Sequence, residues 1–271
     1  MANLDTQFAG SIPEIYDHRL GPIIFQPYAD DLAQRTKRLN PRSVLETAAG
    51  TGIVTRALLG ALSEHSSVTA TDLNQAMVDY AARNTRASGR VRFQKADACA
   101  LPFADGSFDM VVCQFGVMFF PDKVAAHREA FRVLKAGGRL MFNVWGPIDR
   151  NDFANVITEA VAAQFPSDPP RFFARTPHGY HDEATIEREL RSADFANVKI
   201  ERIDRESVAP SARDAAIAFC QGTPLRNEIE SRDPARLEEA TNAAAAALAR
   251  QFGSGRISGR MQALVVEARK P

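Results

Sequence analysis

Short apolar runs alternate with amphipathic stretches along the chain from residue 41 onward. Runs rich in Val, Ile, Leu and Phe predict strands at 43–46, 68–72, 91–96, 109–114, 140–145, 198–203 and 261–268. Apolar positions at helical spacing predict helices at 53–63, 75–87, 124–134, 152–165 and 182–193, and in pieces through 211–252. This repeated strand-then-helix pattern is typical of a parallel sheet covered by helices. The almost wholly apolar run at 109–114 predicts a strand buried on both faces.

The regularity loosens after residue 145, which predicts a division of the chain. We expect an N-terminal helical cover at 1–40, an α/β core at 41–204, a helical lid insertion at 205–260 and a last sheet strand at 261–271. Residues 2–28 show little helical periodicity, so we expect them to be loosely held until ligands bind.

Composition narrows the class of protein. The 271 residues include 45% hydrophobic ones, and 33 basic residues balance 33 acidic ones, which excludes a globally basic surface for nucleic acid. No signal peptide and no apolar run of roughly 18 residues is present, so we expect a cytoplasmic protein without membrane insertion. The three cysteines lack metal-ligand or disulfide spacing, and no metal site is expected.

A compact glycine loop follows the first predicted strand. It reads Glu46-Thr47-Ala48-Ala49-Gly50-Thr51-Gly52 and leads into a helix, so the backbone can approach a ligand closely. Thr55 stands where a dinucleotide-binding fold would need its third glycine, and the lysine of a phosphate-binding P-loop is missing. An ordinary tight turn is the alternative reading.

Acidic residues also close the next two predicted strands. Asp72 could accept hydrogen bonds from both hydroxyls of a ribose, or cap the helix at Asn74. The residues Leu73 and Met77 could flank an adenine ring, although core packing explains them equally well. Asp97 could be an ordinary loop acid. Because open α/β sheets bind ligands at the carboxyl ends of their strands, three acids at such ends favour a nucleoside site.

Further motifs decide the family that the chain resembles. The loop is similar to the E-x-G-x-G-x-G motif, and the stretches 101–109, 114–122 and 132–140 follow in the expected order. The chain therefore resembles the type 11 methyltransferase domain of the class I S-adenosylmethionine-dependent methyltransferases, the group that includes ubiquinone and menaquinone C-methyltransferases. The resemblance spans about residues 41–146. It implies a doubly wound, Rossmann-like α/β fold with a seven-stranded, mostly parallel sheet, and S-adenosylmethionine as cofactor.

The resemblance also implies roles for individual residues. An acid and small residues at the positions of Glu46, Ala48, Gly50 and Gly52 would hold the cofactor, with Ala48 replacing a glycine and altering the loop slightly. Asp97 would bind the adenine amino group and the backbone N–H of Ala98 a ring nitrogen, while Gln114 and Phe115 would lie beside the methionine or adenosine portion. Tyr16 is the candidate for an N-terminal contact, with simple packing as its alternative.

Catalysis is expected to depend chiefly on aligning the methyl donor with a small-molecule acceptor. His178 is the candidate general base because it lies in an aromatic loop after the fifth strand, whereas His65 and His127 are expected on surface turns or helices. A non-catalytic S-adenosylmethionine-binding regulator or partner subunit is the alternative function. A protein or RNA methyltransferase is a third hypothesis, which the zero net charge disfavours. The oligomeric state does not follow from the sequence.

Overall fold

The computed structural model describes residue 5, residues 12–86 and residues 89–271. Its strands are β1 (Ser43–Glu46), β2 (Ser67–Asp72), β3 (Val91–Lys95), β4 (Phe108–Gln114), β5 (Leu134–Trp145), β6 (Ala196–Ala209) and β7 (Ile257–Arg269). Its helices are α1 (Ile12–Ile15), the π-helix η2 (Tyr16–Phe25), α2 (Gln26–Arg38), α3 (Ile53–Ala61), α4 (Gln75–Asn84), α5 (Lys123–Val133), α6 (Asp152–Ala162), α7 (Phe172–Arg175), α8 (Glu183–Arg191), α9 (Ala212–Gln221), α10 (Leu225–Arg232) and α11 (Leu237–Phe252). Single 3₁₀ turns lie at η3 (Val117–Phe119), η4 (Ile148–Arg150) and η5 (Pro234–Arg236).

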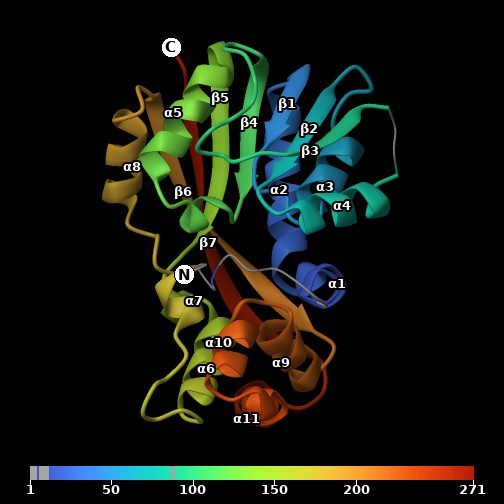
Figure 1. The fold of residues 1–271 in the computed structure, drawn as a ribbon, viewed down its shortest axis with the longest axis vertical. Helices are drawn as coiled ribbons and strands as arrows, with labels where there is room; N and C mark the ends of the chain where they lie inside the picture. Colours follow the sequence, from blue (N-terminus) through green and yellow to red (C-terminus); the bar gives the residue numbers. More distant parts are fainter. Residues whose placement is uncertain (1–4, 6–11, 87–88) are drawn as a thin grey trace. The chain divides into compact units, whose positions relative to one another are not determined.

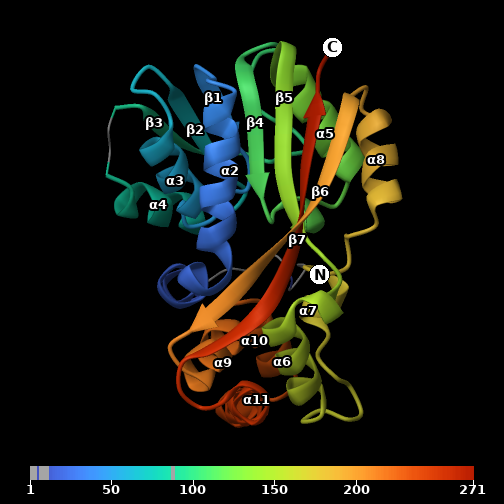
Figure 2. The ribbon, with the colours of Figure 1, turned by 180° about the vertical axis from the view of Figure 1, so that it is seen from behind.

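The strands form one sheet in the order β3-β2-β1-β4-β5-β7-β6. The pairs β1–β2, β1–β4, β2–β3 and β4–β5 are parallel, and β7 runs in the opposite direction (Figure 2). Helix α2 lies over one face of the sheet (Figure 2) and α5 over the other (Figure 1). Met110–Cys113 of β4 are buried, as expected for a strand covered on both faces. The predicted doubly wound α/β fold with a seven-stranded sheet is confirmed.

Strand β5 begins earlier than the sequence pattern indicates. Helix α5 ends at Val133, and the chain becomes extended at Leu134 rather than at Leu140. The register with β4 shifts between Phe108 and Met110, and Gly137 has a φ of 77° in the extra stretch of β5. Gly137 therefore lies in an irregular stretch of the β4–β5 pair, where glycine adopts the left-handed conformation without a steric penalty.

The chain packs as two compact units. The α/β unit contains residues 27–144, 181–202 and 264–271, and the helical unit contains residues 1–26, 145–180 and 203–263. The expected core at 41–204 differs from this division, because α6 within 145–180 packs against α9 and α11 of the helical unit. Similarly, α2 within the expected cover at 1–40 belongs mostly to the α/β unit.

The N-terminal segment is more regular than expected. Residues 12–38 are helical throughout, and Leu20, Ile23, Ile24 and Phe25 of η2 are buried. The weak periodicity arises because η2 is a π-helix with Pro22 inside it, so its apolar residues do not follow the spacing of an α-helix. The first part of the expected loose segment, residues 2–4 and 6–11, lies outside the described residues. No helix of the described chain is long and apolar enough to cross a membrane.

His127 is buried, contrary to the expectation of a surface position. It is 2% exposed on the inner face of α5, and its ring stacks on Phe142 of β5 with 5.6 Å between the ring centroids. Its Nε2 atom has no hydrogen-bond partner within the described chain. Burial, together with the nearby charge of Lys123, lowers the pKa of His127 to about 4.

We expect His127 to make the folded state less stable in acid. Between pH values of about 6.5 and 4, His127 is protonated in the unfolded chain but neutral in the folded chain. The free energy of unfolding therefore falls as the pH falls. The loss from this group is roughly 2 kcal/mol at pH 5 relative to pH 7. Urea unfolding at both pH values should show that His127→Phe removes this difference, whereas His65→Gln at an exposed turn keeps it. Equal pH dependence in His127→Phe and the parent protein would contradict the assignment.

Candidate functional site

The polar residues predicted from the strand ends meet at one edge of the α/β unit. Glu46 ends β1, Asp72 ends β2, Asp97 follows β3 and Gln114 ends β4. Because these four strands are parallel, their carboxyl ends lie along the same edge of the sheet. The structure therefore brings together the candidate residues that the sequence placed far apart.

The glycine loop turns through three left-handed positions. Ala48, Gly50 and Gly52 have φ values of 52°, 55° and 83°. Gly52 precedes α3, and a Cβ atom there would lie 3.1 Å from the Cβ of Ala81 in α4. The glycine at this position thus permits both the turn and the close packing of α4. The loop is fixed to β2 by hydrogen bonds from Ala49 N to Thr71 O and from Gly50 N to Asp72 Oδ2, each 2.9 Å long.

Ala48 keeps the backbone conformation that a glycine would have, which explains how the loop tolerates the substitution. Its methyl group fits because Gly116 lies opposite without a side chain: a Cβ atom built on Gly116 would lie 2.5 Å from the Cβ of Ala48 and 2.7 Å from the Sγ of Cys113. The sequence analysis did not single out Gly116. The sequence feature that could have pointed to Gly116 is a glycine two residues after the end of the predicted strand at 109–114.

Glu46 is buried and is held by Thr55. Glu46 is 1% exposed, and its Oε2 accepts a hydrogen bond of 2.6 Å from Thr55 Oγ1. Burial, and to a smaller extent the charge of Asp72, raises the pKa of Glu46 to about 8, although the Thr55 hydroxyl opposes the shift. Glu46 therefore holds a proton at neutral pH in the free protein.

Asp72 links the glycine loop to the start of α4. Its Oδ2 accepts the bond from Gly50 N, and its Oδ1 accepts one of 2.8 Å from Asn74 N. Asn74, rather than Asp72, caps α4, because its side chain accepts from Ala76 N. Burial raises the pKa of Asp72, and the two backbone hydrogen bonds oppose that shift.

Two apolar neighbours of Asp72 have different environments. Leu73 is 59% exposed, the single large hydrophobic side chain in the exposed class among the described residues, whereas Met77 is 3% exposed and belongs to the core. The exposed Leu73 lies directly after Asp72, at the same edge of the sheet. Packing within the core accounts for Met77.

The third strand end forms a tight turn. Oδ1 of Asp97 accepts a hydrogen bond of 2.8 Å from Cys99 N, and Asp97 bridges to Ala100. The Asp97 side chain is exposed, and Ala98 between these residues is half-buried. The turn presents a carboxylate and a backbone N–H at the edge of the sheet.

The fourth strand end has an unusual backbone. Phe115 is buried with a φ of 50°, a conformation that is unusual for a bulky residue and often marks a functional site. Asn143 of β5 holds it there, because Phe115 N donates to both the carbonyl and the Oδ1 of Asn143, while Asn143 Nδ2 donates to Gln114 Oε1 at 3.3 Å. Tyr28 of α2 packs edge-on against Phe115, with 5.4 Å between the ring centroids. The sequence analysis missed Asn143 and Tyr28, which only tertiary packing brings to the strand end.

Tyr16 and His178 belong to the helical unit. Tyr16 stacks on Phe25 of η2 at 4.7 Å between the ring centroids. His178 is 5% exposed, and its Nδ1 lies 2.8 Å from the carbonyl oxygen of Gly146, the residue that follows β5. A carbonyl only accepts hydrogen bonds, so Nδ1 carries the proton and Nε2 is the basic nitrogen.

The short helix α7, just before His178, is fixed at both ends. Glu228 of α10 accepts a hydrogen bond of 3.1 Å from Phe172 N at the start of α7. Arg175 at its end pairs with Glu228 and with Asp5, each at 2.6 Å. Asp5 and Glu228 thus hold the segment that leads into His178.

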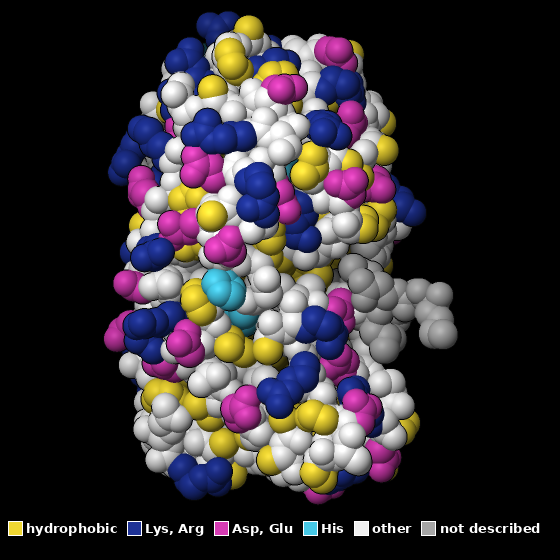
Figure 3. All heavy atoms as spheres, turned by 90° about the vertical axis from the view of Figure 1, so that its left-hand side faces the viewer, with side chains coloured by type: hydrophobic (Ala, Val, Ile, Leu, Met, Phe, Trp, Pro, Cys, Tyr) yellow, Lys and Arg dark blue, Asp and Glu magenta, His cyan; other side chains and the backbone are white. Residues whose placement is uncertain are grey.

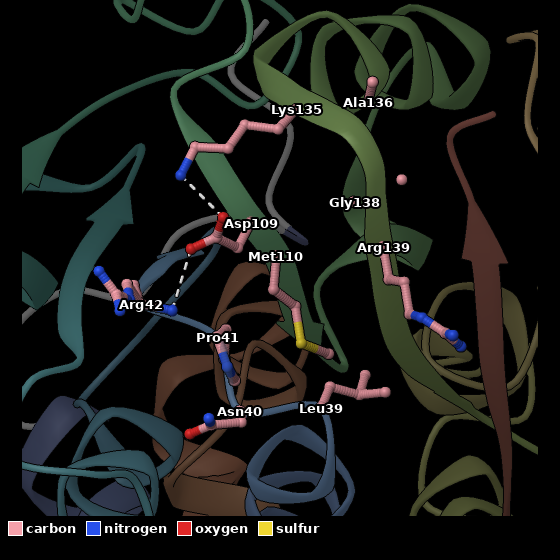
Figure 4. A pocket seen from close by; sticks show the side chains of 11 residues that line it. Leu39, Asn40, Pro41, Arg42, Asp109, Met110, Lys135, Ala136, Gly138 and Arg139 are labelled. Atoms are coloured by element: carbon pink, nitrogen blue, oxygen red, sulfur yellow. Dashed lines mark hydrogen bonds and ion pairs between the residues drawn. The ribbon is translucent and has the colours of Figure 1, made fainter.

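The opposite edge of the α/β unit has a hollow of about 480 Å³ (Figure 4). Asp109 lies in its wall and accepts hydrogen bonds from Arg42 N at 2.9 Å and from Lys135 Nζ at 2.7 Å. These bonds join the amino ends of β1, β4 and β5, so the charged groups in the wall of the hollow have a structural role. No cluster of His, Cys, Asp and Glu residues suited to a metal ion occurs in the described part of the chain.

Comparisons with known proteins concern the family and the fold. The family described as a methyltransferase domain matches residues 45–142, which include every residue of the α/β unit that the sequence analysis named as a candidate. Tyr28 and Asn143 lie outside the matched residues. The ubiquinone/menaquinone biosynthesis C-methyltransferase UbiE of Klebsiella pneumoniae is 33% identical over 171 residues, covering 58% of this chain and 67% of that protein. The YcgJ protein of Bacillus subtilis has a similar fold, with a TM-score of 0.57 and 21% identity over 90% of this chain and 98% of that chain. Phosphoethanolamine N-methyltransferase 2 of Haemonchus contortus, in complex with S-adenosyl-L-methionine, has a TM-score of 0.61 and 16% identity over 100% of this chain and 60% of that chain.

Proposed function

Because the chain belongs to the class I S-adenosylmethionine-dependent methyltransferases, we propose that it methylates a small molecule and does so chiefly by aligning donor and acceptor. S-adenosylmethionine supplies a methyl group that its sulfonium already activates. The residues of this chain must therefore bind the donor, orient the acceptor and exclude water. The arrangement of acids, exposed Leu73 and glycine loop at one sheet edge is the observation that carries the proposal.

The residues at this edge fit the parts of the cofactor. Each oxygen of the Asp72 carboxylate accepts one backbone hydrogen bond and has a second lone pair that can accept from a ribose hydroxyl. Leu73 offers its exposed surface to the adenine ring, and Asp97 with Ala98 N–H offers an acceptor and a donor to the adenine edge. We assign the remaining contacts to Gly50, Gly52, Gln114 and Phe115, with Ala48 and Glu46 shaping the loop. Met77 and Tyr16 stay proposed cofactor contacts.

The names of two similar proteins and the mixed charge of the surface favour a small-molecule acceptor. The Klebsiella relative is named for biosynthesis of ubiquinone and menaquinone, and the Haemonchus structure for phosphoethanolamine. Basic and acidic side chains are interspersed over the face shown in Figure 3, which does not favour a polyanionic nucleic acid. A screen of metabolite mixtures with isotope-labelled S-adenosylmethionine tests the proposal. Release of S-adenosylhomocysteine with label in a small molecule supports it, while tight binding without turnover would favour the non-catalytic alternative.

His178 is the candidate proton acceptor when the acceptor needs one. Its Nε2 is basic because Gly146 holds Nδ1, and Trp145 lies beside the ring at 5.9 Å between the ring centroids. An acceptor that is already ionised, or an amine, needs no such base. We therefore propose that alignment of donor and acceptor contributes more to the rate enhancement than general-base catalysis by His178 does.

His178→Ala is expected to lower kcat by less than the roughly 100-fold to 10,000-fold that loss of an essential general base causes. The measurement is steady-state kinetics with the acceptor identified in the screen, across pH 5–9, with His65→Ala as the control for an exposed histidine. A larger loss of kcat, with unchanged cofactor affinity and without the limb of the pH profile near 6–7, would show that His178 is an essential base.

A further inference from the structure

Thr55 and Glu46 join the two flanks of the glycine loop. Glu46 ends the strand before the loop, and Thr55 lies in the first turn of the helix after it, with side chains joined at 2.6 Å. Both residues are buried, with exposed fractions of 1% and 0%. Thr55 therefore has a definite task at the position where dinucleotide-binding folds have a glycine.

The groups that face Glu46 come from three neighbouring elements. Asp72 of β2 disfavours a negative charge on Glu46, whereas Arg56 of α3 and the hydrogen bonds from Thr55 favour it. Cys113 of β4 is a third titratable neighbour, and its thiol is buried and un-ionised, since burial raises its pKa to about 12. The carboxyl group of Glu46 is thus protonated at neutral pH, with a pKa of about 8. A single positive charge added nearby can lower that pKa enough for the proton to be lost.

We propose that Glu46 is a positioning residue that holds a proton while the cofactor site is free and releases it when S-adenosylmethionine binds, with Thr55 keeping the carboxyl group in place. S-adenosylmethionine carries a sulfonium and an amino group, and S-adenosylhomocysteine has lost the sulfonium charge. A positive charge acts strongly on a buried carboxyl group because little water screens it. On donor binding the proton leaves the Glu46 carboxyl for the solvent buffer, and a proton returns when the product leaves.

This exchange makes the enzyme discriminate between donor and product. Ionised Glu46 favours the charged donor over the neutral thioether, so the preference for S-adenosylmethionine over S-adenosylhomocysteine rises with pH. The effect acts through the glycine loop, which Thr55 and Asp72 tie to α3 and β2.

Calorimetry in two buffers of different ionisation enthalpy counts the protons released on binding. At pH 7, on binding S-adenosylmethionine, we expect the parent protein to release more protons than Glu46→Gln, by most of one proton. On binding S-adenosylhomocysteine, we expect this difference between the parent protein and Glu46→Gln to be smaller. Between pH 6 and 8 the affinity for the donor should rise by up to about tenfold per pH unit in the parent relative to Glu46→Gln. Equal proton release in the parent and in Glu46→Gln would overturn the proposal.

Thr55 variants separate positioning from general packing. Thr55→Val should move the midpoint of proton release to higher pH, and Thr55→Ser should restore it, since serine keeps the hydroxyl. Thr36→Val is the matched control, because Thr36 is equally buried but its hydroxyl donates to Leu32 O at 2.8 Å. The same midpoint in Thr55→Val and Thr36→Val would overturn the role of Thr55.

A measurement on the free protein provides an independent check. Glu46 remains protonated in the folded state up to a pH of about 8, whereas in the unfolded chain it loses its proton near its ordinary pKa of 4.5. Its contribution to stability is therefore present below pH 4.5 and is lost as the pH rises toward 8. Unfolding curves should show that Glu46→Gln lacks this loss, and an identical pH dependence would overturn the proposal.

Discussion

Asp72→Ala is expected to weaken S-adenosylmethionine binding by roughly 1–3 kcal/mol, which is about five-fold to 150-fold in Kd. The variant removes the proposed ribose contact and also the acceptor of the Gly50 N–H, so the loop loses a hydrogen bond of 2.9 Å. Calorimetric titration with S-adenosylmethionine and S-adenosylhomocysteine measures the effect. Both ligands should be weakened by similar factors, because both contain the ribose.

Asp79→Ala is the matched control for this experiment. Asp79 is an exposed acid on α4, and its side chain accepts a hydrogen bond of 2.7 Å from Gln75 on the same helix. Its removal should leave the Kd unchanged. Unchanged nucleoside binding in Asp72→Ala, or tight binding of NAD to the parent protein, would contradict the assignment of this edge.

Gly116→Ala is expected to destabilise the α/β unit by about 1–3 kcal/mol and to weaken cofactor binding at least tenfold. Its φ of −103° suits alanine, so the backbone is not strained by the change. The new methyl group would instead lie 2.5 Å from the Cβ of Ala48 and force the glycine loop to move. Urea unfolding and cofactor titration measure the two effects.

The partner of this contact gives the control. Gly116→Ala combined with Ala48→Gly should recover part of the affinity, because the clash with the loop disappears while that with Cys113 Sγ remains. Gly60→Ala in α3, where an added Cβ meets nothing within 4 Å, should not weaken binding. An affinity of Gly116→Ala equal to that of the parent would show that the loop does not depend on this space.

The ends of the strands could be predicted because they depend on local pattern. An apolar run that stops at Glu46 or Asp72 marks both the strand and the residue at its carboxyl end. Parallel pairing then requires those ends to meet at one edge, and the observed sheet order brings them there. The glycine loop was likewise readable, whereas only the structure shows that Ala48 has the same left-handed conformation as Gly50 and Gly52.

The surroundings of individual side chains could not be predicted in this way. His127 lies on a helix whose pattern gave no sign that the imidazole faces Phe142. The residues after 145 were assigned to the core, because the sequence does not show that α6 packs with α9 and α11. Contacts between residues far apart in the chain depend on how the elements pack, and the periodicity of one element does not specify its partners.

By itself, the sequence determined the α/β fold, the order of the ligand-binding motifs and the family to which the chain belongs, since each depends on short-range pattern and spacing. Only the tertiary structure decided that Thr55 holds Glu46, that Gly116 makes room for Ala48, and that Gly146 fixes the tautomer of His178. These three contacts join separate elements, and their effects on charge and space arise from burial, which exists only once the chain has folded.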